Sequence, residues 1–318
     1  MHIVFQHSTR LPVLKYGGTE RIVFWLMKEL ASLGHNVTLI GHPESDVEKF
    51  GIALIPKKEN WQEQIPCSAD IVHLSSNQTL DKDFPTLVMI QGNGKPGEIF
   101  PQNTVFLSKK HAQNHGAKYF IYNALDFSEY PFYEKKSSWE NFLFLAKASW
   151  KVKNLKSCLK ACKKNKRHLH IAGGRALMPS RFVHNYGMVG GSEKHQLIQK
   201  CDALLWPVRW HEPFGIAVIE AMAYGLFVIA SPYGSLPELI NPQSGKIVQS
   251  EKELIDFMRA KPSFSPSKIR KYVEENFSIT RLAKDYLKAY EKILRGETLN
   301  AKNPSWKPVQ ESEILLDF

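Results

Sequence analysis

The sequence has few cysteines, no long apolar run and no dinucleotide fingerprint, and each absence disfavours a class of protein. Its four cysteines form no Cys-x-x-Cys pair, which favours reduced thiols in a cytoplasmic protein over a disulfide scaffold. No apolar stretch reaches the ~18 residues that span a bilayer, and no signal peptide is visible. A Gly-x-Gly-x-x-Gly motif followed by a ribose-binding acid is missing after the first predicted strand, which argues against a nicotinamide enzyme.

Positive charge is present in excess and is unevenly distributed along the chain. Of the 318 residues, 42 are Lys or Arg and 31 are Asp or Glu, which gives a formal charge of +11. Residues 1–140 hold 14 basic and 15 acidic residues, whereas residues 141–318 hold 28 and 16. The excess therefore belongs to the second part of the chain. It is compatible with nucleic acid, an anionic membrane surface or an anionic small substrate as the partner.

Strand-like and helix-like segments alternate along the chain and then restart after a polar stretch at 126–140. Short apolar runs predict strands, and apolar residues at helical spacing predict helices. The predicted strands are 2–6, 37–40, 70–74, 86–90, 104–107 and 119–122 in the first part, and 141–146, 168–172, 203–206 and 227–230 in the second. The predicted helices are 19–33, 155–164, 195–200, 216–224, 266–276 and 279–294.

This alternation predicts an α/β protein made of two doubly wound, Rossmann-like domains. Uninterrupted apolar strands are typical of parallel sheets buried on both faces. We expect an N-terminal domain at 1–130, a C-terminal domain at 131–280, and a terminal helix and extension at 281–318 that packs back toward the N-terminal domain. Ligands of such sheets bind at the carboxyl ends of the strands, and we expect a further contribution from the cleft between the domains.

The densest chemical signal is the segment 207–225, which carries two glutamates, Glu212 and Glu220, around the start of a predicted helix. A helix N-terminus offers free N–H groups and a positive dipole end, which suit a phosphate. Gly215 allows the backbone to approach a ligand closely. Carboxylates accept hydrogen bonds from vicinal hydroxyls, so the spacing suits a ligand with a diol, a diphosphate and a second diol. A nucleotide-sugar has this layout.

The segment resembles the Glu-Pro-Phe-Gly-x4-Glu-Ala-Met-Ala-x-Gly signature of retaining glycosyltransferases of family four, the glycosyl transferases group 1 with the GT-B fold. Weaker motifs of that family follow the expected order along residues 1–290. They are the glycine turn at 16–21, the strand at 70–73, the junction at 122–126 and the segment 231–240, in which Ser235 replaces a glycine.

The resemblance implies roles for the matching residues. The residues implied in catalysis are Glu212, Lys147 and Lys153. Glu212 would bind hydroxyls of the transferred sugar, and Glu220 would bind the ribose. The residues implied in donor binding are Gly17, Gly18, Gln91, Lys151, Met188, Val189, Pro213, Phe214, Gly215, Ile216 and Glu220. The residues expected on the acceptor side are Glu20, His73 and Asn93.

Two departures from the family pattern concern the donor site. The family neutralises the diphosphate with an Arg and a Lys five residues apart, whereas here Lys147 occupies the Arg position and Val152 lies five residues on. The second cation is therefore Lys153 or Lys151, and lysine lacks the bidentate fork of arginine. Gln91 stands where many relatives have a histidine, which suggests a different donor sugar.

These features predict a retaining hexosyltransferase that moves a sugar from a nucleoside diphosphate sugar, with UDP favoured, to a glycan or lipid-linked acceptor. The resemblance implies no cofactor and no metal, because protein cations replace the metal, and it suggests bacterial cell-envelope polysaccharide or lipopolysaccharide synthesis. We expect a cytoplasmic protein that binds no nucleic acid, and peripheral association with the inner face of the membrane is left open. The alternatives are another GT-B nucleotide-sugar enzyme, such as an epimerase or a donor hydrolase, and a non-catalytic binder of nucleic acid or anionic surfaces. Neither the sugar nor the oligomeric state can be read from the sequence.

Overall fold

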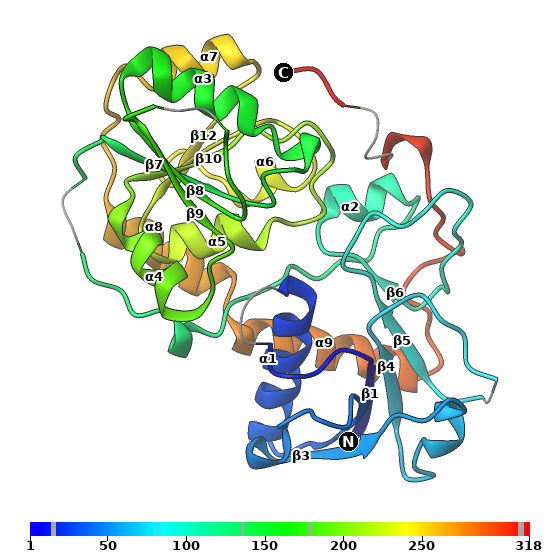
Figure 1. Ribbon diagram of the computed structural model, residues 1–318. Coiled ribbons are helices and arrows are strands. Elements are labelled where there is room, and N and C mark those ends of the chain that lie inside the picture. The colour runs from blue at the N-terminus through cyan, green and yellow to red at the C-terminus, as the bar shows by residue number, and fades with distance from the viewer. Residues whose placement is uncertain (14–16, 82, 135–136, 178–179, 311–314) are drawn as a thin grey trace. The chain divides into compact units, whose positions relative to one another are not determined.

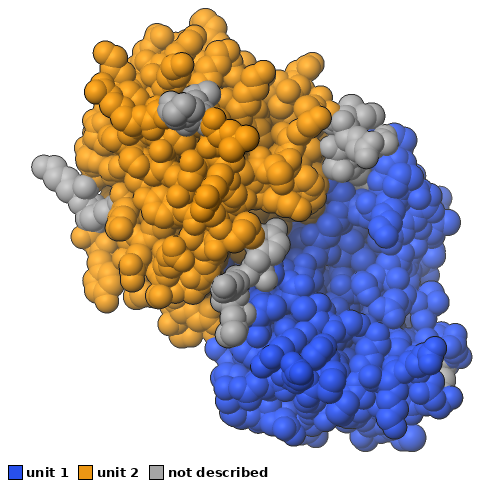
Figure 2. All heavy atoms as spheres, in the orientation of Figure 1, with its two compact units in different colours: residues 1–13, 17–125, 278–310 blue, residues 14–16, 126–277, 311–318 orange. Residues whose placement is uncertain are grey.

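The computed structural model describes residues 1–13, 17–81, 83–134, 137–177, 180–310 and 315–318, which form two compact units. Unit 1 comprises residues 1–13, 17–125 and 278–310 (Figure 2, blue). Unit 2 comprises the described residues of 126–277 and residues 315–318 (Figure 2, orange). The predicted domain boundaries, after residues 130 and 280, lie a few residues beyond these boundaries.

Unit 1 is built on a six-stranded sheet in the order β3-β2-β1-β4-β5-β6, with every pair of neighbours parallel (Figure 1). The central strands β1 and β4 are almost entirely buried, as expected for a parallel sheet covered on both faces. The strand bounds are β1 His2–His7, β2 Asn36–Gly41, β3 Ile52–Pro56, β4 Ile71–Leu74, β5 Thr86–Met89 and β6 Thr104–Val105.

Two long helices of unit 1, α1 (Gly18–Ser32) and α9 (Ile279–Leu294), pack against each other although they come from opposite ends of the chain. Thr280 donates a hydrogen bond of 2.7 Å to Glu29 across this contact. The last long helix is therefore part of unit 1. The other helices of this unit are α2 (Lys109–Asn114) and the 3-10 turns η1 (Glu48–Phe50), η2 (Trp61–Gln64) and η5 (Pro308–Gln310).

Unit 2 repeats this architecture with the strand order β12-β11-β10-β7-β8-β9, again with parallel pairs (Figure 1). The strand bounds are β7 Asn141–Leu145, β8 His168–Ala172, β9 Val183–Gly187, β10 Ala203–Trp206, β11 Phe227–Ala230 and β12 Gly245–Ile247. The two doubly wound α/β units confirm the predicted fold class.

Helices cover both faces of the unit 2 sheet, with α3 and α7 packed together on one face and α5 and α8 packed together on the other (Figure 1). Six of the eight residues of α5 are buried, so this helix lies in the core beside the strands. The bounds are η3 Phe127–Glu129, η4 Lys151–Lys153, α3 Leu155–Asn165, α4 Gly191–Lys200, α5 Ile216–Ala223, α6 Leu236–Leu239, α7 Glu251–Phe257 and α8 Pro266–Asn276.

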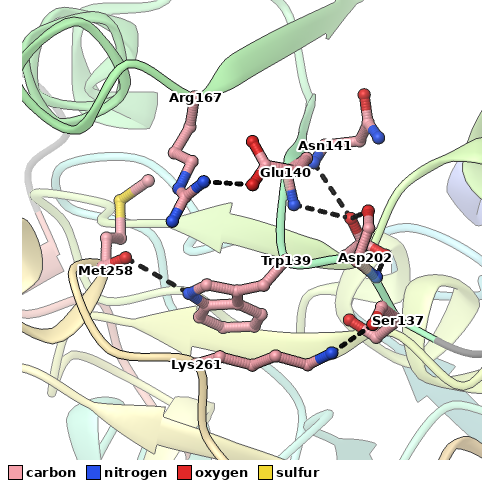
Figure 3. A network of polar contacts seen from close by, with 9 residues as sticks. Ser137, Trp139, Glu140, Asn141, Arg167, Asp202, Met258 and Lys261 are labelled. Atoms are coloured by element: carbon pink, nitrogen blue, oxygen red, sulfur yellow. Dashed lines mark hydrogen bonds and ion pairs between the residues drawn. The ribbon is translucent and has the colours of Figure 1, made fainter.

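A polar network around Asp202 fixes the point where the chain enters the sheet of unit 2 (Figure 3). The carboxylate of Asp202 accepts hydrogen bonds of 2.8–3.0 Å from the backbone and hydroxyl of Ser138 and from the amides of Glu140 and Asn141. Burial alone would raise the pKa of Asp202, but these hydrogen bonds outweigh it and lower the pKa. Because Asp202 immediately precedes β10, the network holds β7 beside the strand that leads to Glu212.

The predicted strand at 119–122 is wrong, since only an isolated bridge joins Phe106 and Phe120 there. The amides of Lys118 and Tyr119 donate to the Asn300 side chain, at 3.3 and 3.2 Å, instead of extending the sheet. The strands β3, β9 and β12 and the short helices α2, α6 and α7 were not predicted. Among the residues that the structure describes, no helix is long and apolar enough to cross a membrane.

Candidate active site

The candidate site lies in the loop between β10 and α5, which is clamped against η4. The Arg209 amide donates to the Val152 carbonyl at 2.7 Å, and the Asn154 side chain donates to the Pro207 carbonyl at 2.9 Å. The loop ends at Gly215, whose φ of 93° lies in the left-handed region that favours glycine and precedes the first turn of α5. These contacts bring η4, with Lys153, beside the loop that carries Glu212.

Glu212 and Lys153 form a buried ion pair. Lys153 Nζ lies 2.6 Å from Glu212 Oε2, and the two side chains are only 7% and 9% exposed, for Glu212 and Lys153 respectively. The indole N–H of Trp210 donates to the same oxygen at 3.1 Å. Within the described part of the chain, Glu212 Oε1 accepts no hydrogen bond. One carboxylate oxygen therefore holds the protein's own cation while the other is available to a further donor.

Three tryptophans surround the ammonium group of Lys153. Nζ lies 4.6 Å from the ring centroid of Trp210, 4.8 Å from that of Trp206 and 5.8 Å from that of Trp150. A cation near the face of an indole is attracted by the quadrupole of the ring. The rings and the carboxylate thus stabilise a positive charge that has little contact with water.

The segment 231–240 packs against the backbone of Glu212 and fixes its position. The Ser235 amide donates to the Glu212 carbonyl at 3.0 Å, and the Ser235 hydroxyl donates to the Phe214 carbonyl at 2.6 Å. A Cβ atom at Gly234 would lie only 2.2 Å from the Glu212 carbonyl oxygen and 2.3 Å from its amide nitrogen. Gly234 is required by this close approach, and the serine that departs from the family pattern adds a hydrogen bond to the loop.

Glu220 lies inside α5 and forms a second buried ion pair in unit 2. Lys194 Nζ, from α4, lies 2.5 Å from Glu220 Oε1, and the Tyr130 hydroxyl donates to the same oxygen at 2.6 Å. The side chains of Lys194 and Glu220 are 9% and 8% exposed. Both signature glutamates are therefore paired with a lysine from another element of the same unit.

The two other predicted cations differ from Lys153. Lys147 and Lys151 are exposed, and among the described residues neither side chain makes a hydrogen bond or an ion pair. Lys147 lies in the loop after β7, and Gly173 packs closely against this loop. A Cβ atom at Gly173 would lie 2.2 Å from the Ala146 carbonyl oxygen. The structure therefore brings Lys153 to Glu212 and leaves Lys147 and Lys151 on the surface.

The remaining predicted donor residues of unit 2 are placed in two ways. Phe214 is buried, and its ring packs edge-on against Phe277 at a centroid distance of 5.9 Å, so only its backbone could meet a ligand. Pro213 is likewise buried, whereas Gly215 and Ile216 are half-buried at the start of α5. After β9, Met188 is 59% exposed and Val189 is half-buried.

Glycine and amide residues of unit 1 form two smaller local arrangements. Gly17 precedes α1 with a φ of 147°, and a Cβ atom there would lie 2.7 Å from Glu20 Oε2. Gln91 and Asn123 pair their side-chain amides reciprocally, at 2.9 and 3.3 Å. Their roles in binding, like that of Gly18, stay predictions. Tyr16 of the same glycine motif lies outside the described residues.

Histidines hold the loop that contains Asn93, and another histidine lies in the core. The ring nitrogens Nε2 of His111 and His115 lie 3.0 Å from the carbonyl oxygens of Gly92 and Asn93.

His73 is fully buried, 2.6 Å from the Tyr290 hydroxyl, and burial lowers its pKa to about 3. The structure does not bring His73 to a surface that an acceptor could reach, because this neutral ring is part of the unit 1 core.

The residues that pair with Glu220, and the tryptophans around Lys153, were not predicted from the sequence. Lys194 and Tyr130 are 26 and 90 positions from Glu220, so no local spacing pointed to them. Trp150 and Trp210 were visible as aromatic residues beside Lys153 and Glu212, and that proximity was an unused signal. No group of three or more His, Cys, Asp or Glu side chains in the described residues is arranged to hold a metal ion.

Comparisons with known proteins fit this geometry. Residues 126–260 match the family described as Glycosyl transferases group 1, which confirms the sequence resemblance over the segment that carries Glu212 and Glu220. AviGT4, a glycosyltransferase involved in avilamycin A biosynthesis, has a TM-score of 0.77 at 21% identity, over 96% of this chain and 99% of AviGT4. Anabaena Alr3699/HepE, solved with UDP and glucose, has a TM-score of 0.66 at 16% identity, over 92% and 99%. At these identities the likeness shows the fold, and it confirms the GT-B class.

Two relatives of known genetic location come from Klebsiella pneumoniae, and both are described as uncharacterized proteins in the cps region. The 41.2 kDa protein is 45% identical over 56 residues, and the 42.6 kDa protein is 27% identical over 106 residues. The matches cover 18% and 33% of this chain and only 15% and 27% of the relatives. They are local similarities to part of each relative.

Proposed function

We propose that this protein is a retaining glycosyltransferase that uses a nucleoside diphosphate sugar, with UDP as the favoured nucleotide. The observation that carries the proposal is the Glu212 carboxylate, which is held by Lys153 on Oε2 and has Oε1 available at the start of the helix that carries Glu220. An oriented carboxylate oxygen can accept a hydrogen bond from a hydroxyl of the transferred sugar. The match of residues 126–260 to the glycosyltransferase family supports this interpretation.

In the proposed reaction, the bond between the anomeric carbon and the diphosphate breaks, and the acceptor oxygen bonds to that carbon on the same face. The acceptor's proton passes to the departing diphosphate oxygen. Lys153 and Lys147 would stabilise the negative charge that develops on the diphosphate, together with amides at the start of α5. Catalysis would rest on positioning and electrostatics, with no protein nucleophile and no metal.

We propose a glycan or a lipid-linked sugar as the acceptor, in the synthesis of a bacterial cell-envelope polysaccharide or lipopolysaccharide. Local similarity to two cps-region proteins of Klebsiella pneumoniae supports this setting. Such an enzyme would work in the cytoplasm, and the basic second part of the chain would suit contact with the inner face of the membrane. No nucleic acid is part of the proposed reaction.

A donor screen on the purified full-length protein tests the proposal. The protein is first heated with UDP, GDP or ADP, and at least one nucleotide should raise its melting temperature. It is then incubated with UDP-, GDP- and ADP-sugars and a set of glycan acceptors, with and without EDTA. Acceptor-dependent nucleotide release that is insensitive to EDTA supports a metal-independent transferase.

Other outcomes of the screen identify the alternatives. Nucleotide release without a glycosylated product would indicate a donor hydrolase, and conversion of the donor sugar without release would indicate an epimerase. No thermal shift with any nucleotide, together with salt-dependent binding of nucleic acid, would contradict the proposal and favour a basic binding protein.

A further inference from the structure

The indole of Trp150 is an exposed aromatic ring beside the Glu212–Lys153 pair. Trp150 is 45% exposed, although its backbone is held by hydrogen bonds to Lys147 and Lys153 at 3.0 and 2.9 Å. Its ring packs against that of Trp210 at a centroid distance of 5.5 Å and an interplanar angle of 57°. One side of the ring is thus fixed by the protein while a large part of the side chain meets water.

The position of Trp150 relative to the carboxylate matches the two requirements of carbohydrate recognition. A sugar ring has an apolar face of C–H groups and a rim of hydroxyls, so it binds where an aromatic surface adjoins hydrogen-bond acceptors. Lys153 Nζ links the two features, at 5.8 Å from the Trp150 ring and 2.6 Å from Glu212 Oε2. Both distances are measured from the same ammonium nitrogen, so the ring and the carboxylate lie close together, and Glu212 Oε1 accepts no hydrogen bond within the described residues.

We propose that Trp150 is a sugar-stacking residue that sets sugar affinity at this site. A pyranose ring packs its C–H face on the indole while one of its hydroxyls donates to Glu212 Oε1. The indole N–H of Trp210 orients the carboxylate by donating a hydrogen bond of 3.1 Å to Glu212 Oε2, and the Trp210 ring packs against the Trp150 ring. This inference rests on the proposed function, and the sugar can come from the donor or from the acceptor.

Indole N–H signals of the full-length protein labelled with 15N-tryptophan test the inference directly. The chain has seven tryptophans, and Trp150→Phe identifies the Trp150 signal by removing it. The probes are UDP against UDP-glucose, GDP against GDP-mannose, and ADP against ADP-glucose, followed by methyl glycosides added to the nucleotide-bound protein. A Trp150 shift with the nucleotide-sugar but not with the nucleotide assigns the donor sugar. A shift that requires the methyl glycoside assigns the acceptor sugar.

Substitutions then measure the contribution of the ring. Trp150→Ala should weaken binding of the sugar-bearing ligand roughly three- to tenfold, the size expected for one aromatic contact. Trp150→Phe should restore most of the affinity, and affinity for the nucleotide alone should not change, because Lys153 and Glu212 remain. Tyr133→Ala removes another aromatic side chain of unit 2, one that is 74% exposed, and should have no effect.

The outcomes separate this inference from the function on which it rests. If a nucleotide-sugar binds but neither it nor a methyl glycoside moves the Trp150 signal, and Trp150→Ala binds both as the wild type does, stacking on Trp150 is wrong and the proposed function stands. Equal weakening of nucleotide and nucleotide-sugar by Trp150→Ala would also overturn it, because the ring would then act by holding Lys153. If no nucleotide-sugar binds at all, the proposed function itself fails, and the stacking proposal fails with it.

Discussion

Lys153 Nζ lies 2.6 Å from Glu212 Oε2, and both side chains are almost completely buried. Lys153 lies in η4 after β7 and Glu212 lies in the loop after β10, so the two groups follow neighbouring strands of the unit 2 sheet although they are 59 positions apart in sequence. Each charge compensates the other in the ligand-free protein. Glu212 Oε1 can then accept a hydrogen bond from a sugar hydroxyl while Oε2 stays paired with Lys153, so no buried charge is left unpaired.

Removing one member of this pair should destabilise the fold. In Lys153→Met the Glu212 carboxylate stays buried without its cation, and the free energy of unfolding should fall by about 3–5 kcal/mol. The double variant Lys153→Met, Glu212→Leu replaces both charges and should recover most of that loss. Urea denaturation of the three proteins measures this. A single variant as stable as the wild type would show that the pair is not formed in solution.

Gly234 should tolerate no side chain, because the Glu212 backbone occupies the space. A Cβ atom at position 234 would clash with two backbone atoms of Glu212 as well as adopt a φ of 66°. Gly34→Ala is the matched control, since Gly34 has a φ of 84° but nothing within 4 Å of a Cβ atom. We expect Gly34→Ala to cost about 1 kcal/mol of stability and to leave ligand binding intact.

Gly234→Ala should instead weaken nucleotide-sugar binding at least tenfold or prevent folding. Thermal melting and titration calorimetry on both variants distinguish the two results. Equal behaviour of the two alanine variants would mean that strain at φ, and not the approach of Gly234 to Glu212, explains the glycine.

Glu220 and its partners should determine nucleotide affinity in the proposed donor site. Glu220→Gln keeps the shape but loses the charge that pairs with Lys194, and it should weaken binding of the nucleotide by about tenfold, as expected for one charge-assisted contact. Tyr130→Phe removes one hydrogen bond to Glu220 and should have a smaller effect. Titration calorimetry with the nucleotide found in the donor screen measures both. An unchanged dissociation constant in Glu220→Gln would remove Glu220 from the ribose site.

The sequence predicted most central strands and long helices because their apolar spacing is local. Strands such as β8 and β10, and helices α8 and α9, lie where the spacing placed them. The errors in strand prediction lie at sheet edges, where distant residues decide the outcome. Beside 119–122, the Asn300 side chain accepts hydrogen bonds from the amides of Lys118 and Tyr119, about 180 residues earlier in the chain. No pattern within 119–122 could indicate this distant contact.

The candidate site was predictable only where the chemistry is concentrated in one segment. The two glutamates and the helix start were visible together in 207–225, whereas Lys194 and Tyr130 reach Glu220 through the fold alone. The choice between Lys151 and Lys153 depended on local backbone geometry. The η4 turn and the left-handed Asn154, with a φ of 55°, bury Lys153 and leave Lys151 in water.

Buried histidines should make the fold sensitive to acid. His73 titrates near pH 6.5 when unfolded but has a pKa of about 3 when folded, so between these values the unfolded state binds more protons. Stability from this residue is full above pH 6.5 and is lost as the pH falls toward 3, by roughly 1.4 kcal/mol per pH unit.

His73→Gln can keep a hydrogen bond to Tyr290 and has no proton to gain in this range. Its free energy of unfolding should therefore fall less steeply between pH 7 and pH 5 than that of the wild type, by about 2 kcal/mol in total. Urea denaturation at several pH values provides the measurement. Parallel curves for the two proteins would contradict the assignment of a neutral, buried His73.

The most direct test of the catalytic role of Glu212 is kcat/KM of Glu212→Gln with the donor identified by the screen. The amide keeps the size of the side chain and can still accept a hydrogen bond from Lys153, but it leaves that buried ammonium group without its counter-charge, so some stability should be lost. Thermal melting therefore checks that the variant is folded at the assay temperature. Transfer should fall by about 100-fold or more, because an oriented charge is lost beside the reacting sugar. Glu251→Gln, which removes a carboxylate that pairs with Lys160 elsewhere in unit 2, should leave transfer unchanged. Wild-type kcat/KM in Glu212→Gln would contradict the assignment of Glu212 to the active site.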